Sequence, residues 1–184
     1  EPESTFTQTS LRFSVAGVGL KLSMSNEGGR FVLPSTSEGG KWLVKFPDQN
    51  FPNLPSNEFA TMEFARSVGL AVPRTMLVDR SAVARTPDSW WAGEETAFAI
   101  ERFDRGPGGA RVHMEDMAQV RGVRPQQKYE GNLETVASLY YRRYDSMSLI
   151  EFTRRAAFNL VVGNTDAHLK NWSLLYEEPR RPVI

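Results

Sequence analysis

Apolar and polar positions alternate along the N-terminal part of the chain, as they do in β-strands. Residues 11–24 alternate on both sides of a glycine-interrupted break at 17–19, which is typical of a β-hairpin. Short runs at 30–34 and 41–47 continue the strand pattern, and residues 73–78 repeat it further on. We therefore expect a β-rich first part.

The spacing of apolar residues changes at Asn57, where they begin to recur every three or four positions. Prolines up to Pro55 indicate that the preceding ten residues are not helical. Gly69 stands where a glycine commonly ends a helix. One helix among the strands is therefore predicted, with an apolar face made of Phe59, Met62, Ala65 and Val68.

The C-terminal part of the chain is dominated by helical patterns. Residues 96–105 still predict a buried strand that ends in charged residues, and helices are expected at 113–122, 131–144 and 148–163. In the last helix, Ser148 and Glu151 have the spacing of a capping box, and Gly163 follows its end.

These patterns predict an α+β fold with two parts. Residues 1–105 would form a β-rich, nucleotide-binding lobe with one helix, and residues 106–184 would begin a helical lobe. The chain begins at Glu1 without a methionine and stops soon after a strand pattern resumes, so we expect it to be a piece of a longer protein whose helical lobe is incomplete here.

Composition excludes several classes of function. Lys and Arg number 22, as do Asp and Glu, so the net charge is zero and direct nucleic-acid binding is not expected. The chain has no cysteine, which excludes disulfides and thiolate metal sites. It contains no apolar run of the ~20 residues needed to span a bilayer and no signal segment. We expect a cytoplasmic protein with no membrane contact.

The segment "GNTDAHLKNW" carries the first candidate chemistry. Asp166 and Asn171 lie five positions apart between a helix and a strand, the spacing of the catalytic loop of protein kinases. There, the Asp accepts the proton of the substrate hydroxyl and the Asn binds magnesium. The alternative is that Asp166 caps a turn and Asn171 is an ordinary loop residue.

Lys45 ends the apolar strand "WLVK", as the phosphate-binding lysine of kinases does. Kinases orient this lysine with a glutamate on the next helix, where Glu58 and Glu63 are both present; Glu58, in the first turn, is the favoured partner. The alternatives are a lysine that snorkels at a strand edge and a glutamate that merely favours the positive end of the helix dipole.

The hairpin "SVAGVGLK" precedes this lysine. Gly17 and Gly19 would let backbone N–H groups approach phosphates closely, although most such tips are plain turns. The order along the chain is that of a kinase: glycine-rich hairpin, strand lysine, glutamate-bearing helix, and then the Asp–Asn loop.

Several segments together resemble the HipA family of bacterial serine/threonine kinase toxins. These are "SVAGVGLKLSM", "NEFATMEFARSVGLAVP", "ERFDR", "MEDMAQV", "KYEG" and above all "GNTDAHLKNWSLL". The last segment is also similar to the D-x-H-x-x-N loop of phosphoinositide kinases. The resemblance covers nearly the whole chain and implies a bilobal, protein-kinase-like fold.

The resemblance also implies roles for individual residues. Asp166 would be the catalytic base, Asn171 a magnesium ligand, and His168 a residue near the phosphates. Lys45 would bind the α- and β-phosphates of ATP. Three further residues complete the implied set: Glu101 and Phe103 as an adenine-recognising hinge that uses main-chain groups, and Ser14 as the autophosphorylated serine. As alternatives, Glu101 and Phe103 are strand-end charge and core aromatic, His168 is a satisfied loop histidine, and Ser14 is a plain strand serine.

One departure from the family pattern stands out. The family loop commonly runs G-x-Q-x-K; here Gly19 stands at the glutamine position, whereas Lys21 is kept. The second metal-binding aspartate would lie beyond Ile184.

The resemblance implies a Mg²⁺- and ATP-dependent kinase that phosphorylates a protein serine or threonine, with an aminoacyl-tRNA synthetase as the substrate and a small DNA-binding antitoxin as the partner. Two alternatives stay open: a non-catalytic nucleotide-binding scaffold in an antitoxin repressor complex, and a small-molecule phosphotransferase.

Overall fold

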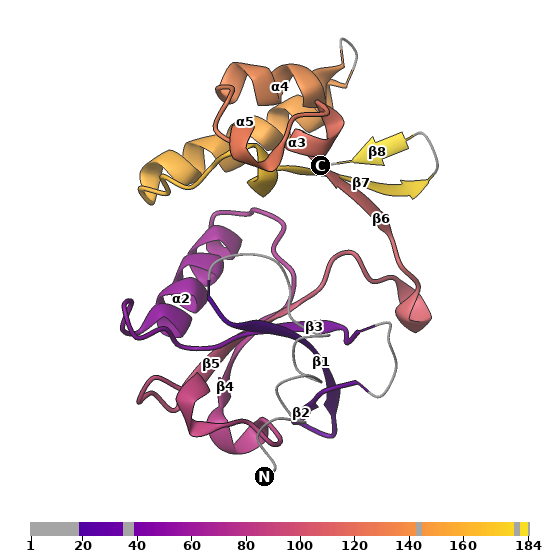
Figure 1. The fold of residues 1–184 in the computed structure, drawn as a ribbon. Coiled ribbons are helices and arrows are strands. Elements are labelled where there is room, and N and C mark those ends of the chain that lie inside the picture. The colour runs from indigo at the N-terminus through magenta and orange to yellow at the C-terminus, as the bar shows by residue number, and fades with distance from the viewer. Residues whose placement is uncertain (1–18, 35–38, 143–144, 179–180, 184) are drawn as a thin grey trace. The chain divides into compact units, whose positions relative to one another are not determined.

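The structure, a computed structural model, describes residues 19–34, 39–142, 145–178 and 181–183 (Figure 1). The chain folds into two compact units, Glu1–Phe103 and Asp104–Ile184. Both combine helices with an antiparallel sheet, so the fold is α+β. In the described part of the chain, no helix has the length and apolar character needed to cross a bilayer.

The N-terminal unit is built on a five-stranded sheet in the order β2-β1-β3-β5-β4, in which all neighbours are antiparallel. Helix α2 packs on strands β4 and β5. The elements are β1 (Lys21–Glu27), β2 (Arg30–Val32), β3 (Trp42–Lys45), α2 (Leu54–Ser67), β4 (Thr75–Asp79) and β5 (Thr96–Glu101), with short 3₁₀ turns at Arg80–Ala82 and Asp88–Trp90.

A core of alternating strand residues and aromatic rings holds this sheet. Trp91 is fully buried, and its ring edge meets Phe46 with 5.3 Å between centroids. Gly40 lies against β1, where a Cβ atom would come within 1.9 Å of the Met24 backbone. Only glycine can occupy that position, and it lets Ser23 exchange hydrogen bonds with the Gly40 main chain at 2.9 and 3.0 Å.

The C-terminal unit combines a three-stranded antiparallel sheet, in the order β6-β7-β8, with three helices. Its core contains Tyr140, Phe152 and Trp172, and the Phe152 and Trp172 rings lie 4.9 Å apart. The elements are β6 (His113–Asp116), α3 (Met117–Val120), α4 (Leu133–Tyr141), α5 (Ser146–Val161), β7 (Ser173–Glu178) and β8 (Arg181–Val183), with 3₁₀ turns at Pro107–Gly109, Pro125–Gln127 and Leu169–Asn171.

Helix α2 begins earlier than its apolar period predicted. It starts at Leu54 rather than Asn57, and Pro55 lies in its first turn. A proline is compatible with that position because the N–H group it lacks has no partner within the helix there. Glu58 consequently lies beyond the first turn, which contains no acidic residue.

Two further predictions were wrong. Residues 113–116 form strand β6 rather than helix, because they pair with residues 173–176 of β7, and only Met117–Val120 is helical. The N-cap of α5 is Asp145, whose carboxylate accepts from the Ser148 N–H group at 2.9 Å, whereas Glu151 pairs with Arg155. The predicted Ser148–Glu151 capping box is therefore absent, but Gly163, with φ 67°, does follow the helix end.

Candidate functional site

Lys45 stands at the last position of β3 and binds Glu58 of α2. The distance from Lys45 Nζ to Glu58 Oε2 is 2.5 Å. The ammonium group also lies 5.7 Å from the centre of the Phe98 ring. The two charged side chains are 31% and 22% exposed, so the pair is partly screened from water yet remains within reach of a ligand.

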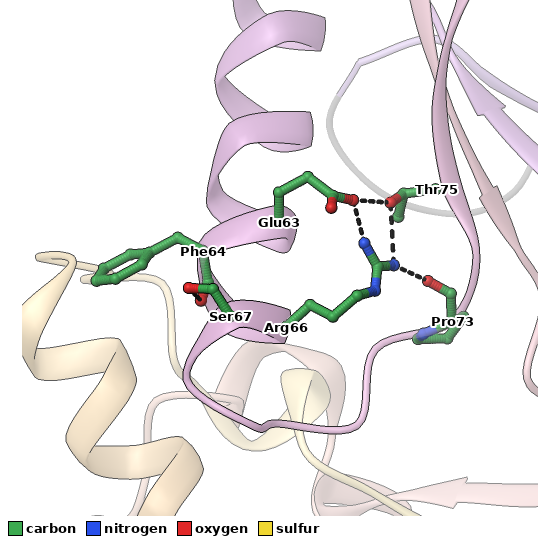
Figure 2. A network of polar contacts seen from close by, with 6 residues as sticks. All are labelled: Glu63, Phe64, Arg66, Ser67, Pro73 and Thr75. Carbon is green, nitrogen blue, oxygen red and sulfur yellow. Dashed lines mark hydrogen bonds and ion pairs between the residues drawn. The ribbon is translucent and has the colours of Figure 1, made fainter.

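Glu63 has different partners, which explains why it does not pair with Lys45. Its carboxylate binds Arg66 and accepts from Thr75 Oγ1 at 2.8 Å (Figure 2). Arg66 Nη2 in turn donates to the Pro73 carbonyl at 2.7 Å. The hydrogen bonds from Arg66 and then Thr75 lower the pKa of Glu63. This network ties the C-terminal end of α2 to the start of β4.

Lys21 is a third charged residue of this cluster, and sequence reasoning assigned it no role. In the antiparallel register of strands β1 and β3, its backbone lies directly opposite that of Lys45. Burial, and then the positive charge of Lys45, lower the pKa of Lys21, whereas the charge of Glu58 acts in the opposite direction. Two lysines and one carboxylate give a locally positive site, which suits a polyphosphate. The signal that could have found Lys21 was its position directly after the glycine-rich segment.

The glycine-rich segment itself is described only from Gly19 onward. Gly19 has φ 80°, a conformation that favours glycine, and nothing in the described residues would contact a Cβ atom there. The predicted roles of Gly17 and Ser14 fall outside the described residues.

The proposed hinge residues lie at the end of β5. Glu101 is the last residue of that strand, and its carboxylate is 2.5 Å from Lys41 Nζ. Phe103 lies past the strand end and is 54% exposed, so it is not a core aromatic. The N–H groups of Glu101 and Arg102 already donate within the unit, at 2.8 Å each to the carbonyls of Arg74 and Lys41. Adenine recognition therefore cannot use those two N–H groups.

In the C-terminal unit, the loop after α5 brings Asp166 and Asn171 together. Asn171 Nδ2 donates to the Asp166 main-chain carbonyl and lies 3.3 Å from the carboxylate atom Oδ2. The Asp166 N–H group donates to Asn164 Oδ1 at 3.0 Å, closing a tight turn. The Asp166 side chain is 68% exposed, so its carboxylate can meet a substrate.

His168 belongs to the same loop, and its side chain is only 7% exposed. Its Nε2 atom is 3.5 Å from Asp166 Oδ1, and its Nδ1 atom accepts from the Lys170 N–H group at 3.2 Å. Trp172 Nε1 donates to the Ala167 carbonyl at 3.2 Å and ties the loop to the core. The loop thus presents a carboxylate, an amide and an imidazole within six residues.

This donor set fits a magnesium ion that arrives with a phosphate. The amide nitrogen of Asn171 is held by Asp166, which leaves its oxygen Oδ1 for a hard cation. In the described ranges, no group of three or more His, Asp or Glu side chains forms a metal cage. Mg²⁺ commonly binds through one or two protein oxygens and substrate phosphates rather than in such a cage.

Comparisons with known proteins identify the family. The model of the HipA-like C-terminal domain matches residues 13–183. The chain is 44% identical over 178 residues to a Sinorhizobium fredii protein named "Putative kinase Y4dM", covering 95% of this chain and 43% of that protein. It is 31% identical over 183 residues to the serine/threonine-protein kinase toxin HipA of Shewanella oneidensis, covering 88% of this chain and 39% of the toxin.

A solved structure agrees with these matches. HipA of S. oneidensis, in complex with HipB and operator DNA, superposes with a TM-score of 0.69 at 30% identity, covering 88% of this chain and 40% of that one. The chain thus spans less than half the length of these relatives. A family match over residues 13–183, supported by both sequence and structural similarity, shows that this chain belongs to the HipA family.

Proposed function

We propose that this chain is part of a kinase that transfers the γ-phosphoryl group of ATP to a serine or threonine hydroxyl of a protein. The observation that carries the proposal is the loop of the C-terminal unit, in which an exposed Asp166 carboxylate is held by an asparagine five positions later. This arrangement suits proton acceptance at Asp166 Oδ1 or Oδ2 and metal binding at Asn171 Oδ1. Kinase names among the relatives support it.

In this proposal, the N-terminal unit supplies the phosphate-binding charges. Lys45 binds the α- and β-phosphates, and Glu58 holds its ammonium group in place. Gly17 and Gly19 approach the phosphates through their backbone N–H groups, while Glu101 and Phe103 recognise adenine through main-chain groups other than the N–H of Glu101. Magnesium, when bound, neutralises charge that develops on the phosphate oxygens.

In the C-terminal unit, Asp166 and His168 are the residues that we propose to act in phosphoryl transfer. Asp166 accepts the hydroxyl proton of the acceptor side chain. His168, whose Nε2 atom is 3.5 Å from Asp166 Oδ1, would lie near the phosphates of bound ATP. The two units then correspond to the two lobes of a bilobal, protein-kinase-like fold.

We base the proposed substrate and partner on the resemblance to the family. We propose a toxin of a toxin–antitoxin system that acts in the cytoplasm on an aminoacyl-tRNA synthetase and binds a small DNA-binding antitoxin. The S. oneidensis relative, which was solved with HipB and operator DNA, supports the antitoxin. The rival from another class is a non-catalytic scaffold, which would bind nucleotide and antitoxin without phosphoryl transfer.

The test is transfer of ³²P from γ-labelled ATP to protein, measured with the intact protein and Mg²⁺. Asp166→Asn should lower the rate by about 1,000-fold or more while ATP affinity and the thermal midpoint stay close to wild type. Glu177→Gln, which neutralises an exposed acid on β7, should not change the rate. Nucleotide binding without transfer by the wild-type protein would favour the scaffold.

A further inference from the structure

The orientation of His168 determines which of its nitrogens faces Asp166. Nδ1 accepts a hydrogen bond from the Lys170 N–H group at 3.2 Å, so this atom carries no proton. The neutral ring must then carry its proton on Nε2, the atom 3.5 Å from Asp166 Oδ1. The Asp166 carboxylate therefore faces an N–H group rather than a lone pair. A rotation of the imidazole ring would break this arrangement, so it depends on the orientation of the ring.

A residue outside the loop contacts this ring. The Tyr129 ring meets the His168 ring edge to face, with 5.1 Å between centroids and 84° between planes. Tyr129 is 63% exposed, so burial of its own surface does not explain its position. Edge-to-face contact restricts the rotation of an imidazole, and such aromatic pairs favour this geometry.

The neighbouring residue fixes Tyr129 relative to the loop. The Lys128 carbonyl accepts from the N–H group of the buried Leu169 at 3.1 Å, which joins residues 128–129 to the turn that begins at Leu169. Lys128 Nζ also lies 4.8 Å from the centre of the Tyr129 ring, a cation–π distance. One main-chain hydrogen bond and one ring contact thus join this segment to the catalytic loop.

We propose that Tyr129 is a positioning residue that acts through His168 on Asp166. It holds the imidazole in the plane where Nδ1 accepts from Lys170 and Nε2–H faces the carboxylate. The His168 carbonyl accepts from the Asn171 N–H group at 2.9 Å. By holding His168, Tyr129 would therefore also steady the asparagine that is proposed to bind the metal. The catalytic purpose of Tyr129 rests on the proposed kinase function, whereas its effect on the imidazole does not.

The first arm of the test observes the imidazole directly. The intact protein is labelled with ¹⁵N-histidine, and the His168 signals are assigned by their loss in His168→Gln. Wild type and Tyr129→Phe should show one tautomer with the proton on Nε2. Tyr129→Leu should give signals averaged between two tautomers. Tyr176→Leu is the matched control, because the Tyr176 ring centre lies 5.2 Å from that of the other described histidine, His113. This variant should alter the ¹⁵N signals of His113 and leave those of His168 unchanged.

The second arm measures ADP release from Mg-ATP by the same proteins. Tyr129→Leu should lower kcat by about 3- to 10-fold with the KM for Mg-ATP unchanged, the size expected for loss of one aromatic contact. Tyr129→Phe should match wild type, as should Tyr141→Leu, which removes another exposed tyrosine. Because Tyr129 is 63% exposed, Tyr129→Leu and Tyr129→Phe should keep the wild-type thermal midpoint.

A single His168 tautomer in Tyr129→Leu would overturn the proposal. An equal loss in Tyr129→Phe would also overturn it, because the hydroxyl rather than the ring would then be responsible. If the wild-type protein releases no ADP while the tautomer still depends on Tyr129, the contact with His168 stands and the kinase function fails.

Discussion

Glu58 of helix α2 binds Lys45 of strand β3, with 2.5 Å between Oε2 and Nζ, while Glu63 of the same helix turns to Arg66 and Thr75. The helix therefore carries two acids with separate tasks. One orients a lysine beside Lys21, and the other anchors the helix end to the next strand (Figure 2). This division allows variants of α2 to separate effects on the proposed catalysis from effects on stability.

Replacing Lys45 with Met should weaken phosphate binding, because a point charge is lost with little change in side-chain volume. We expect kcat/KM for Mg-ATP to fall by at least about 10-fold in the intact protein. Lys41→Met is the matched control. Lys41 directly precedes strand β3, its side chain is 58% exposed, and it pairs with Glu101 rather than with Glu58. Steady-state ADP release measures both, and equal losses would mean that the wrong lysine has been assigned.

Neutralising the two acids of α2 should give opposite results. Glu58→Gln leaves the Lys45 ammonium without its charged partner, so turnover should drop by about 10-fold with little loss of stability. Glu63→Gln weakens the contacts to Arg66 and Thr75, so the thermal midpoint should fall while turnover stays near wild type. The reverse pattern, found by the same kinetic assay and by thermal melting, would refute this division.

Asp145 should make the stability of the protein depend on acid pH. Hydrogen bonds from the Ser148 main chain and then its hydroxyl lower the pKa of Asp145 below the ordinary value of an aspartic acid. The folded state thus favours the carboxylate, so its stabilisation is present above that value and is lost as the pH falls through the lower, folded-state pKa. Asp145→Ala should cost about 1 kcal/mol of unfolding free energy at neutral pH, a typical N-cap loss.

Asp145→Asn separates the cap from its charge. Asparagine caps helices about as well as aspartate, so this variant should keep most of the neutral-pH stability. It should lose the part of the acid dependence that comes from residue 145, as measured by urea unfolding between pH 2 and 7. An unchanged pH profile would show that the carboxylate of Asp145 does not contribute to it.

Ser14 should be the main site of autophosphorylation. A phosphate there adds about −1.5 to −2 charge to the segment that leads into Lys21 and is proposed to lie over the phosphates of ATP, so repulsion should reduce activity. Mass spectrometry after incubation with Mg-ATP identifies the site, and Ser14→Ala should abolish it. Full activity in the fully Ser14-phosphorylated protein would contradict this mechanism.

Short-range patterns alone predicted much of this protein. The period of apolar residues indicated helix α2 and its end at Gly69, and alternation indicated strand β3 with Lys45 at its end. The spacing of Asp166 and Asn171 indicated that one loop would hold both, as it does. These features depend on neighbours within a few residues, so the local sequence contains their cause.

Only the tertiary structure decided the features that depend on distant partners. Residues 113–116 form strand β6 because they pair with β7, which lies some sixty residues later in the chain, and this pairing outweighs their helical pattern. Strand register placed Lys21 beside Lys45. The sequence already favoured Glu58 as the partner of Lys45, but the contacts that engage Glu63 and Arg66 with Thr75 and Pro73 exist only in the fold. Tyr129 met His168 by the same long-range packing. No period or spacing encodes such contacts, because they form only once the backbone has brought separate segments together.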